Sequence, residues 1–310
     1  MQNTQSLKLQ DHFTKPLIPT KVYDKLVHWF FLFNGFLTVI LLLGIFTLLF
    51  STAVPAFQEI DVWAFLTGNE WNPTSYYESK YGIIPMLVST FMVTLGALLI
   101  AVPVGIGAAV YLSDVASPKV TEIVKPIVEI LAGIPSVVIG FLGIVFVGPL
   151  IAKVFNIYNG LNAVNGSILL AVMALPTIIS ISEDALRSVP SSYDQASLAL
   201  GASKWQTAIR VKIPAALSGI IAACMLGMGR AIGETMTVLM ATGCAPAMPD
   251  SFLGSVRTLT SSIAIELGEV AYNTTHYYAL FALGLVLFVI TFIINLISDM
   301  ILHRYEKVSR

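Results

Sequence analysis

Two charged residues interrupt an apolar run that is otherwise long enough to cross a membrane. Arg230 and Glu234 are the only acidic or basic residues between Pro214 and Asp250. A charged side chain at the middle of a bilayer costs about 2.5–3.5 kcal/mol on insertion scales, so such residues usually have a function. At a spacing of four they would share one helical face and partly neutralise each other. Arginine before glutamate is the less favourable order, so local helix stabilisation explains the pair poorly.

The chemistry that this segment could perform is the passage of an anion. A guanidinium group matches tetrahedral oxyanions by paired hydrogen bonds. Thr235 and Thr237 could add hydroxyl groups, and Glu234 would keep Arg230 from retaining the anion, since conduction needs release as well as capture. We therefore expect Arg230, Glu234, Thr235 and Thr237 to line a translocation pathway. An inter-helix ion pair that only fixes packing is the alternative, and the role of Glu234 in pairing, gating or proton binding stays open.

Two glycines accompany the charged pair on the same expected helix. Gly229 and Gly233 form a stripe that lies about 100° round the helix from the charges. Small residues allow a neighbouring backbone to approach closely. We expect this stripe to serve helix packing while the charged face meets a polar cavity.

A polar segment at residues 185–214 carries the signals of two short helices separated by a glycine. Ser192 and Gln195 have the spacing of a capping box for the first helix, and Ser203 and Gln206 repeat it for the second. Gly201 lies between the two and predicts the left-handed residue that ends the first helix. The segment therefore predicts a compact helical knuckle between two membrane spans.

Such a knuckle is suited to docking against another protein. An ordinary capped loop is the alternative interpretation on local grounds alone. The residues that we expect to form the coupling surface, from the first helix to the proline before the next apolar run, are Gln195, Ala196, Ser197, Gly201 and Pro214.

The composition is that of a polytopic membrane protein. Of 310 residues, 56% are hydrophobic and 11% are charged, and the mean hydropathy is +0.82. The net charge of −1 gives no sign of nucleic-acid binding. The sequence lacks a catalytic triad, a zinc motif and a phosphate-binding loop, so we expect no enzyme activity, metal or cofactor. Six runs can hold the roughly 20 apolar residues that cross a bilayer, and we place the spans near residues 29–51, 85–112, 131–154, 165–182, 215–241 and 278–302.

Lysine and arginine residues divide unevenly between the two sides of these spans. Thirteen of the seventeen fall on one side, three fall on the other, and Arg230 lies inside a span. The positive-inside rule therefore puts both termini and the knuckle in the cytoplasm. The expected divisions are a cytoplasmic leader at residues 1–28, a first span at 29–51, an extracytoplasmic loop at 52–84, a transmembrane core at 85–302 and a cytoplasmic tail at 303–310.

From residue 85 onward the spans are rich in helix breakers. Pro103, Pro135, Gly140 and Pro176 are examples. In lipid such breaks are tolerated where protein or water satisfies the freed backbone groups, and they are frequent in transporter cores. An amphipathic stretch at residues 258–270 predicts a short helix on the outer surface, with Glu266 away from the centre of its apolar face.

Two groups of residues resemble a known family. The knuckle resembles the coupling loop of ABC-importer permeases, in which Glu-Ala-Ala, a glycine and Ile-x-Leu-Pro recur at this spacing. Here Gln195 and Ser197 replace the first and third residues. The charged segment at residues 229–237 is similar to that of the C-type permease of phosphate-specific ABC importers. The likeness covers the chain from residue 81 onward and includes residues 131–138, 258–270 and 276–287.

The resemblance implies an all-α integral membrane protein with six transmembrane helices in the fold of type I ABC-importer permeases. It implies a subunit of an ATP-driven phosphate importer in the prokaryotic plasma (inner) membrane. Such a subunit pairs with an A-type phosphate permease to enclose one pathway. It receives phosphate from an extracytoplasmic phosphate-binding protein and couples to a cytoplasmic ATPase dimer.

Three other interpretations stay open at this point. A permease for molybdate or sulfate would share the knuckle but should lack the Arg230–Glu234 segment. A membrane-embedded enzyme would need a catalytic constellation facing one surface, and the sequence contains none. A membrane scaffold in phosphate signalling would use the knuckle to dock a signalling partner.

Overall fold

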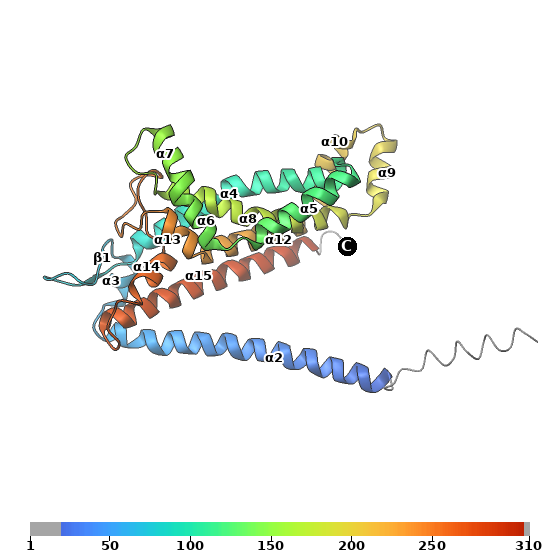
Figure 1. Cartoon of the computed structure of the whole chain (residues 1–310). Coiled ribbons are helices and arrows are strands. Elements are labelled where there is room, and N and C mark those ends of the chain that lie inside the picture. The colour runs from blue at the N-terminus through green and yellow to red at the C-terminus, as the bar shows by residue number, and fades with distance from the viewer. Residues whose placement is uncertain (1–19, 307–310) are drawn as a thin grey trace, which may run out of the picture. The chain divides into compact units, whose positions relative to one another are not determined.

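The computed structural model describes residues 20–306 and the side chains of residues 24–301. The part of the predicted leader before residue 20 and the predicted tail after residue 306 lie outside this range. The described chain is almost wholly helical (Figure 1). It divides into two units, with the boundary between residues 51 and 52.

The first unit is built by one long helix, α2 (Thr20–Ala53). The segment Asp24–Gln58 has a mean hydropathy of 2.5 and is long enough to cross a membrane, as predicted. Polar side chains of this helix bond to their own backbone: Asn34 donates to Phe30 O at 2.7 Å and Thr47 to Leu43 O at 2.7 Å. Such bonds satisfy polar groups where lipid offers no partner.

The second unit opens with short outer elements and continues into the helical core. The outer elements are the 3₁₀ turn η1 (Val54–Gln58), helix α3 (Val62–Thr67) and an antiparallel hairpin of strands β1 (Trp71–Asn72) and β2 (Lys80–Tyr81). The core helices are α4 (Ile84–Val110), α5 (Pro118–Gly133), α6 (Ser136–Leu142), α7 (Gly148–Phe155), α8 (Ala163–Arg187), α12 (Leu217–Gly233), α13 (Met236–Ala241) and α15 (Thr275–Glu306). Single π-helical turns follow α4 and α6: η2 (Tyr111–Val115) and η3 (Gly143–Val147).

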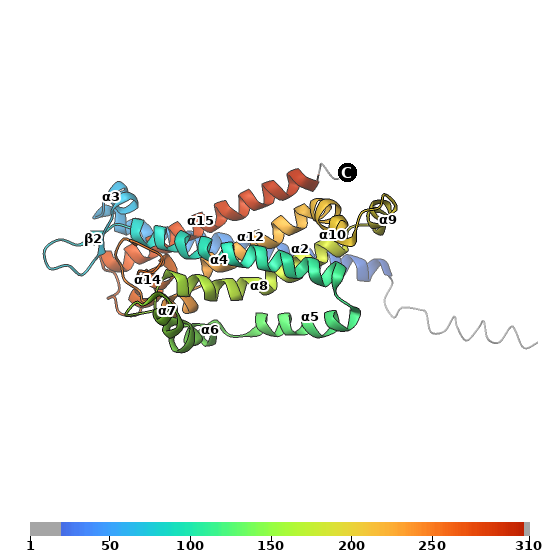
Figure 2. The ribbon, with the colours of Figure 1, turned by 90° about the horizontal axis from the view of Figure 1, so that it is seen from above.

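The knuckle and one short outer helix complete the second unit. The knuckle consists of α9 (Ser191–Ala199), α10 (Lys204–Thr207), the π-helical turn η4 (Ala208–Lys212) and α11 (Ile213–Ala215). Helix α14 (Leu259–Glu266) falls within the stretch predicted for a short helix. The knuckle lies at one end of this unit, whereas β1, α7 and α14 lie at the opposite end (Figures 1 and 2).

Close packing of α4, α8 and α12 forms the middle of the core. Ile178 of α8 fits against Gly105 of α4 and Gly227 of α12, where an added Cβ would lie 2.7 Å and 2.8 Å from the isoleucine side chain. Neither glycine therefore accepts a larger residue without a shift of the helices. Small residues at helix contacts are the usual device by which membrane helices approach each other.

The number of spans agrees with the sequence prediction, but the third span begins later than predicted and the fifth is not a single helix. Among the described residues, five helices are long and apolar enough to cross a membrane, and a sixth span results when a bent pair is counted as one. The predicted third span at residues 131–154 is wrong as a continuous helix, because α5 ends at Gly133 and α6 begins at Ser136. Pro135 causes this break, since proline lacks an N–H and disfavours helical geometry in the residue before it.

The predicted fifth span at residues 215–241 is also wrong as one helix. The segment Lys204–Ala215 meets Leu217–Gly233 at an angle of 74°. The following helix then ends at Gly233, and the chain resumes as a helix only at Met236. The charged segment that the sequence placed inside a regular helix therefore contains a break.

Candidate functional site

The charged segment lies where α12 ends. Glu234 has extended backbone angles (φ −69°, ψ 130°), and Thr235 precedes the first residue of α13. A break of this kind in a membrane helix frees backbone polar groups, and it is tolerated where protein or a water-filled cavity satisfies them. Discontinuous helices of this type form the substrate sites of many transporters.

Arg230 occupies the last turn of α12 and has an exposed side chain. It makes no hydrogen bond or ion pair with any residue that the structure describes. The predicted pairing of Arg230 with Glu234 on one helical face is wrong, because Glu234 has left the helix. The arginine side chain is therefore available to a partner outside this chain or to a passing anion.

Glu234 interacts with the half-helix that follows it. Its Oε1 accepts a hydrogen bond from Thr237 N at 3.3 Å, within the first turn of α13. Its backbone carbonyl accepts a bond from Thr260 Oγ1 at 2.9 Å. The carboxylate thus acts as a cap for α13, which is a role that the sequence did not indicate.

The two threonines of the predicted pathway differ in accessibility. Thr235 is half-buried, whereas Thr237 is fully buried. Thr237 Oγ1 donates to Ser136 O at 3.0 Å and also contacts the sulfur of Met173. The bond to Ser136 joins the break in the fifth span to the first residue of α6, so that this break lies beside the one between α5 and α6.

The glycines near Arg230 are open on the surface of this chain. An added Cβ at Gly233 would meet nothing within 4 Å, and one at Gly229 would lie 3.8 Å from Asn295 Oδ1. Within this chain, the close approach occurs instead at Gly140, where a Cβ would lie 2.9 Å from the sulfur of Met240. Packing of α6 against α13 therefore depends on Gly140, whereas Gly229 and Gly233 make no comparably close contact with the described residues.

Helix α14 holds the break at the end of the second unit opposite the knuckle. Its N-terminus carries a capping box between Thr258 and Ser261, and the residues of its first turn are buried. Leu259 N donates to Thr90 Oγ1 of α4 at 3.1 Å. Because Thr260 bonds to the carbonyl of Glu234, α14 connects α4 to the unwound segment.

The far end of α14 is anchored by a hub around Glu266. The carboxylate accepts bonds from Trp71 Nε1 at 3.0 Å and from Arg257 at 2.6 Å, and it lies 2.7 Å from His276 Nε2. The sequence predicted only that Glu266 lies away from the centre of the apolar face, and did not indicate that these contacts leave its side chain only 14% exposed. The hub ties the outer hairpin, α14 and the start of α15 together.

Burial alone would raise the pKa of Glu266, but the hydrogen bonds from His276 and Trp71 and the charge of Arg257 outweigh burial and lower that pKa from its ordinary value of 4.5. A group whose pKa falls on folding stabilises the protein above its unfolded pKa, and this contribution is lost as the pH falls through the folded pKa. The hub is therefore stabilised at neutral pH and weakened in acid.

We expect the melting temperature of the purified permease to decrease as the pH is lowered from about 6 to about 3, with the loss from Glu266 confined to pH values below about 4.5. Glu266→Gln should lower stability at neutral pH by about 1.5–3 kcal/mol, the usual worth of a hydrogen bond to a charged group. The melting temperature of Glu266→Gln should fall less on acidification than that of the wild type. Equal acid sensitivity of the two proteins would contradict this assignment.

The knuckle has the predicted glycine break. Gly201 adopts φ +85°, in the left-handed region, and ends the helix as expected. The capping box of Ser203 and Gln206 is present, with bonds of 3.2 Å and 2.8 Å. Ser197 Oγ lies 2.9 Å from Thr207 Oγ1 and so joins α9 to α10.

The predicted capping box of Ser192 and Gln195 is wrong. Pro190 occupies the N-cap position of α9, where no side chain caps the helix, and Ser192 lies inside the first turn. Among the predicted coupling residues, Gln195, Ala196 and Gly201 are exposed, Ser197 is half-buried and Pro214 is exposed within α11.

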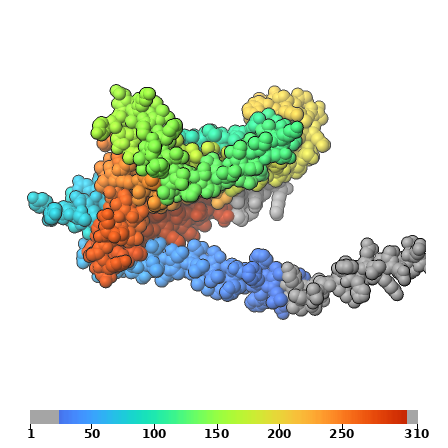
Figure 3. Space-filling model, viewed as in Figure 1, coloured from blue at the N-terminus to red at the C-terminus, as the bar shows by residue number. Residues whose placement is uncertain are grey.

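The knuckle also exposes large apolar side chains. Leu200, next to the glycine break, is 90% exposed, and Trp205 is 60% exposed. In Figure 3 this part of the chain forms a protrusion at one end of the second unit. An apolar side chain at the tip of a protrusion is available to a docking partner.

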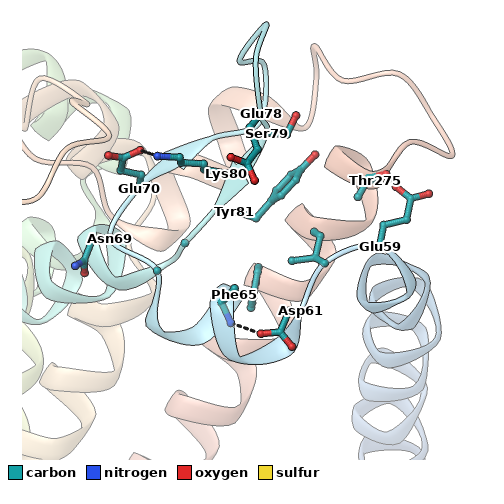
Figure 4. Close-up of a pocket in the computed structure, with 14 residues that line it drawn as sticks. Glu59, Asp61, Phe65, Asn69, Glu70, Glu78, Ser79, Lys80, Tyr81 and Thr275 are labelled. Atoms are coloured by element: carbon teal, nitrogen blue, oxygen red, sulfur yellow. Dashed lines mark hydrogen bonds and ion pairs between the residues drawn. The ribbon is translucent and has the colours of Figure 1, made fainter.

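At the opposite end an open pocket of about 790 Å³ lies between α3, the hairpin and the start of α15 (Figure 4). Its lining includes four acidic residues and one lysine, Lys80, which pairs with Glu70 at 2.6 Å. Glu59 accepts a hydrogen bond from Thr275. Within residues 24–301, no group of three or more His, Cys, Asp or Glu side chains has the geometry of a metal site.

Comparisons with known proteins agree with this architecture. A family model described as "Binding-protein-dependent transport system inner membrane component" matches residues 101–307. The probable ABC transporter permease protein YqgH of Bacillus subtilis is 40% identical over 233 residues, which are 75% of each chain. The phosphate transport system permease protein PstC of Mesorhizobium japonicum is 33% identical over 289 residues, which are 87% of each chain.

A solved structure shares the fold. The crystal structure of a bacterial ABC transporter involved in the import of the acidic polysaccharide alginate gives a TM-score of 0.61 at 16% identity, covering 92% of this chain and 99% of that chain. The long match to the family model and the identities to the two permeases establish the family. The chain belongs to the binding-protein-dependent transport system inner membrane components and is a non-catalytic permease subunit of an ABC importer.

Proposed function

We propose that this chain is the C-type permease of an ATP-driven phosphate importer, in which it forms half of the translocation pathway. The observation that carries the proposal is the break after Gly233, with Arg230 in the turn before it exposed and without a hydrogen bond or ion pair to the described residues. A guanidinium group beside freed backbone groups offers a fork of donors to a tetrahedral oxyanion. The half-buried Thr235 adds a hydroxyl group at the same break.

The other half of the pathway comes from a second permease of the A type. An added Cβ at Gly233 would meet nothing within 4 Å, and one at Gly229 would meet only Asn295 Oδ1 at 3.8 Å, which suits the approach of a partner helix beside Arg230. Closing the pathway between two chains would place Arg230 in a less polar setting than water, where its attraction for an anion is stronger. Phosphate is the substrate that the likeness to a phosphate transport system permease supports.

The knuckle couples this pathway to a cytoplasmic ATPase dimer. Its rigid pair of helices, joined through Gly201 and the bond between Ser197 and Thr207, presents Leu200 and Trp205 to a partner. The phosphate-binding protein docks at the opposite end, around the hairpin and α14. The placement of the knuckle and of β1 and α14 at opposite ends of the second unit supports this assignment (Figure 1).

Uptake by the reconstituted complex tests the proposed function. Vesicles that contain both permeases and the ATPase, with ATP on the ATPase side and the binding protein outside, should accumulate labelled phosphate. The uptake should require ATP and should resist an excess of sulfate or molybdate. Preferential uptake of either competing anion would contradict the assignment of phosphate.

The orientation proposed for the chain puts the knuckle and both termini in the cytoplasm. Ser192 is exposed and makes no hydrogen bond with the described residues, so Ser192→Cys is a suitable label site in a variant lacking Cys224 and Cys244. We expect an impermeant thiol reagent to label it only after the membrane is opened. Tyr76→Cys at the tip of the outer hairpin is the matched control and should react in intact cells. The reverse pattern would overturn the orientation.

A further inference from the structure

A buried lysine joins the knuckle to the end of α4. Lys212 lies in η4, and only 8% of its surface is exposed. Its ammonium group pairs with Asp114 Oδ1 in η2, the turn that ends α4, and lies 3.5 Å from Asp194 Oδ2 in α9. Burying an ammonium group is unfavourable unless it is paired. The two carboxylates therefore fix Lys212 between the knuckle and the core.

The two carboxylates hold the lysine unequally. Asp114 is itself fixed, because Ser113 Oγ donates to its Oδ2 at 2.9 Å and its side chain is only 13% exposed. Asp194 lies farther from the lysine and is more exposed, and its buried Oδ1 has no partner among the described residues. Asp114 is thus the main anchor, and Lys212 is bound more firmly to α4 than to α9.

The other end of α4 reaches the break in the fifth span. Helix α4 has 27 residues and a length of about 40 Å at 1.5 Å per residue. Near its outer end Thr90 Oγ1 accepts the bond from Leu259 N of α14, and Thr260 of α14 bonds to the carbonyl of Glu234. Figure 2 shows α4 running between the two ends of the second unit. One helix therefore connects the knuckle to the segment beside Arg230.

We propose that Lys212 is a positioning residue of the transport cycle, whose pair with Asp114 transmits movement of the knuckle to α4 and from there to the break at Glu234. The inference rests on the proposed function. Without the ion pair, apolar contacts still hold the knuckle against the core, through Ala208 packed with Ala109 and Leu186. Loss of the pair should therefore leave the complex assembled while it disconnects ATP hydrolysis from transport.

The test compares Lys212→Met, which keeps an unbranched side chain one heavy atom shorter and removes its charge, with the wild type in the reconstituted complex. We expect the bound ATPase and its rate of hydrolysis to remain within about twofold of the wild type. Phosphate taken up per ATP hydrolysed should fall at least about tenfold. Lys119→Met is the matched control, because Lys119 is exposed at the start of α5 and makes no ion pair with the described residues. The Lys119→Met complex should take up as much phosphate per ATP hydrolysed as the wild type.

A double-mutant cycle separates a transmitting pair from two independent structural residues. Asp114→Asn should lower the phosphate taken up per ATP hydrolysed, which we call the coupling ratio, as Lys212→Met does. The coupling ratio of the double variant should be no lower than that of either single variant. Multiplicative losses in the double variant would overturn the inference. So would loss of uptake in proportion to loss of bound ATPase, which would indicate a docking role only.

Two further outcomes distinguish failure of this inference from failure of the proposed function. Equal coupling ratios in the wild type and in Lys212→Met would overturn this inference and leave the proposed function intact. Absence of ATP-driven uptake by the wild-type complex would overturn the proposed function itself, and the inference with it.

Discussion

Arg230→Gln is expected to abolish phosphate uptake while the complex still assembles and hydrolyses ATP. Arg230 is exposed and unpaired within the described chain, beside the break that follows Gly233. Its removal therefore breaks no hydrogen bond or ion pair to the described residues. Two hydrogen bonds from a charged group are worth about 3–6 kcal/mol, so the loss of an anion contact of this kind predicts a fall in uptake of more than about a hundredfold.

Two control variants sharpen this prediction. Arg230→Lys keeps the positive charge but loses the planar fork, so we expect partial uptake. The double variant Arg230→Gln with Glu234→Gln should stay inactive, because the Glu234 carboxylate caps α13 through Thr237 N and has no bond to Arg230. Full rescue by the double variant would mean that Arg230 belongs to an ion pair that only fixes packing. Uptake is measured with ATPase activity as the assembly control.

The features that the sequence predicted correctly depend on local signals. Apolar runs of sufficient length identify membrane spans regardless of their partners. Gly201 and the box of Ser203 and Gln206 are defined by residues within one or two turns of each other, and the structure contains both. The position of the knuckle was therefore readable from the sequence alone.

The break at Glu234 could not be read in the same way. No proline marks it, and glycine followed by glutamate is compatible with a continuing helix. Contacts from distant segments fix the break: the hydroxyl of Thr260 donates a hydrogen bond to the carbonyl of Glu234, and the hydroxyl of Thr237 donates one to the carbonyl of Ser136. Tertiary contacts thus override the local preference for a helix.

Distance along the chain also hid the two polar clusters. Trp71 and Glu266 are 195 residues apart, and Lys212 and Asp114 are 98 residues apart. Each residue alone reads as an ordinary loop or surface residue. The wrong capping box has a different cause, since Pro190 itself occupies the N-cap position and moves Ser192 into the helix.

Gly201→Val is expected to lose coupled phosphate uptake and to weaken the association of the ATPase, with the permease still inserted. The backbone at Gly201 has φ +85°, and an added Cβ would meet nothing within 4 Å. Any effect must therefore come from backbone strain and not from a clash. Holding a residue with a Cβ in the left-handed region costs about 1–2 kcal/mol, and release of that strain would change the angle between α9 and α10.

Gly201→Asn is the matched control for the backbone argument, because asparagine tolerates the left-handed conformation and also adds a side chain. A strain of about 1–2 kcal/mol corresponds to a factor of about 5–30 in an equilibrium constant. We therefore expect Gly201→Val to bind the ATPase about 5–30 times more weakly, whereas Gly201→Asn should bind it with nearly the wild-type affinity. The measurements are ATPase binding to the purified permeases and ATP-dependent phosphate uptake. Equal defects in both variants would point to a direct contact between the ATPase and this position. Wild-type binding and uptake by Gly201→Val would contradict the argument that the knuckle must keep this geometry to dock the ATPase.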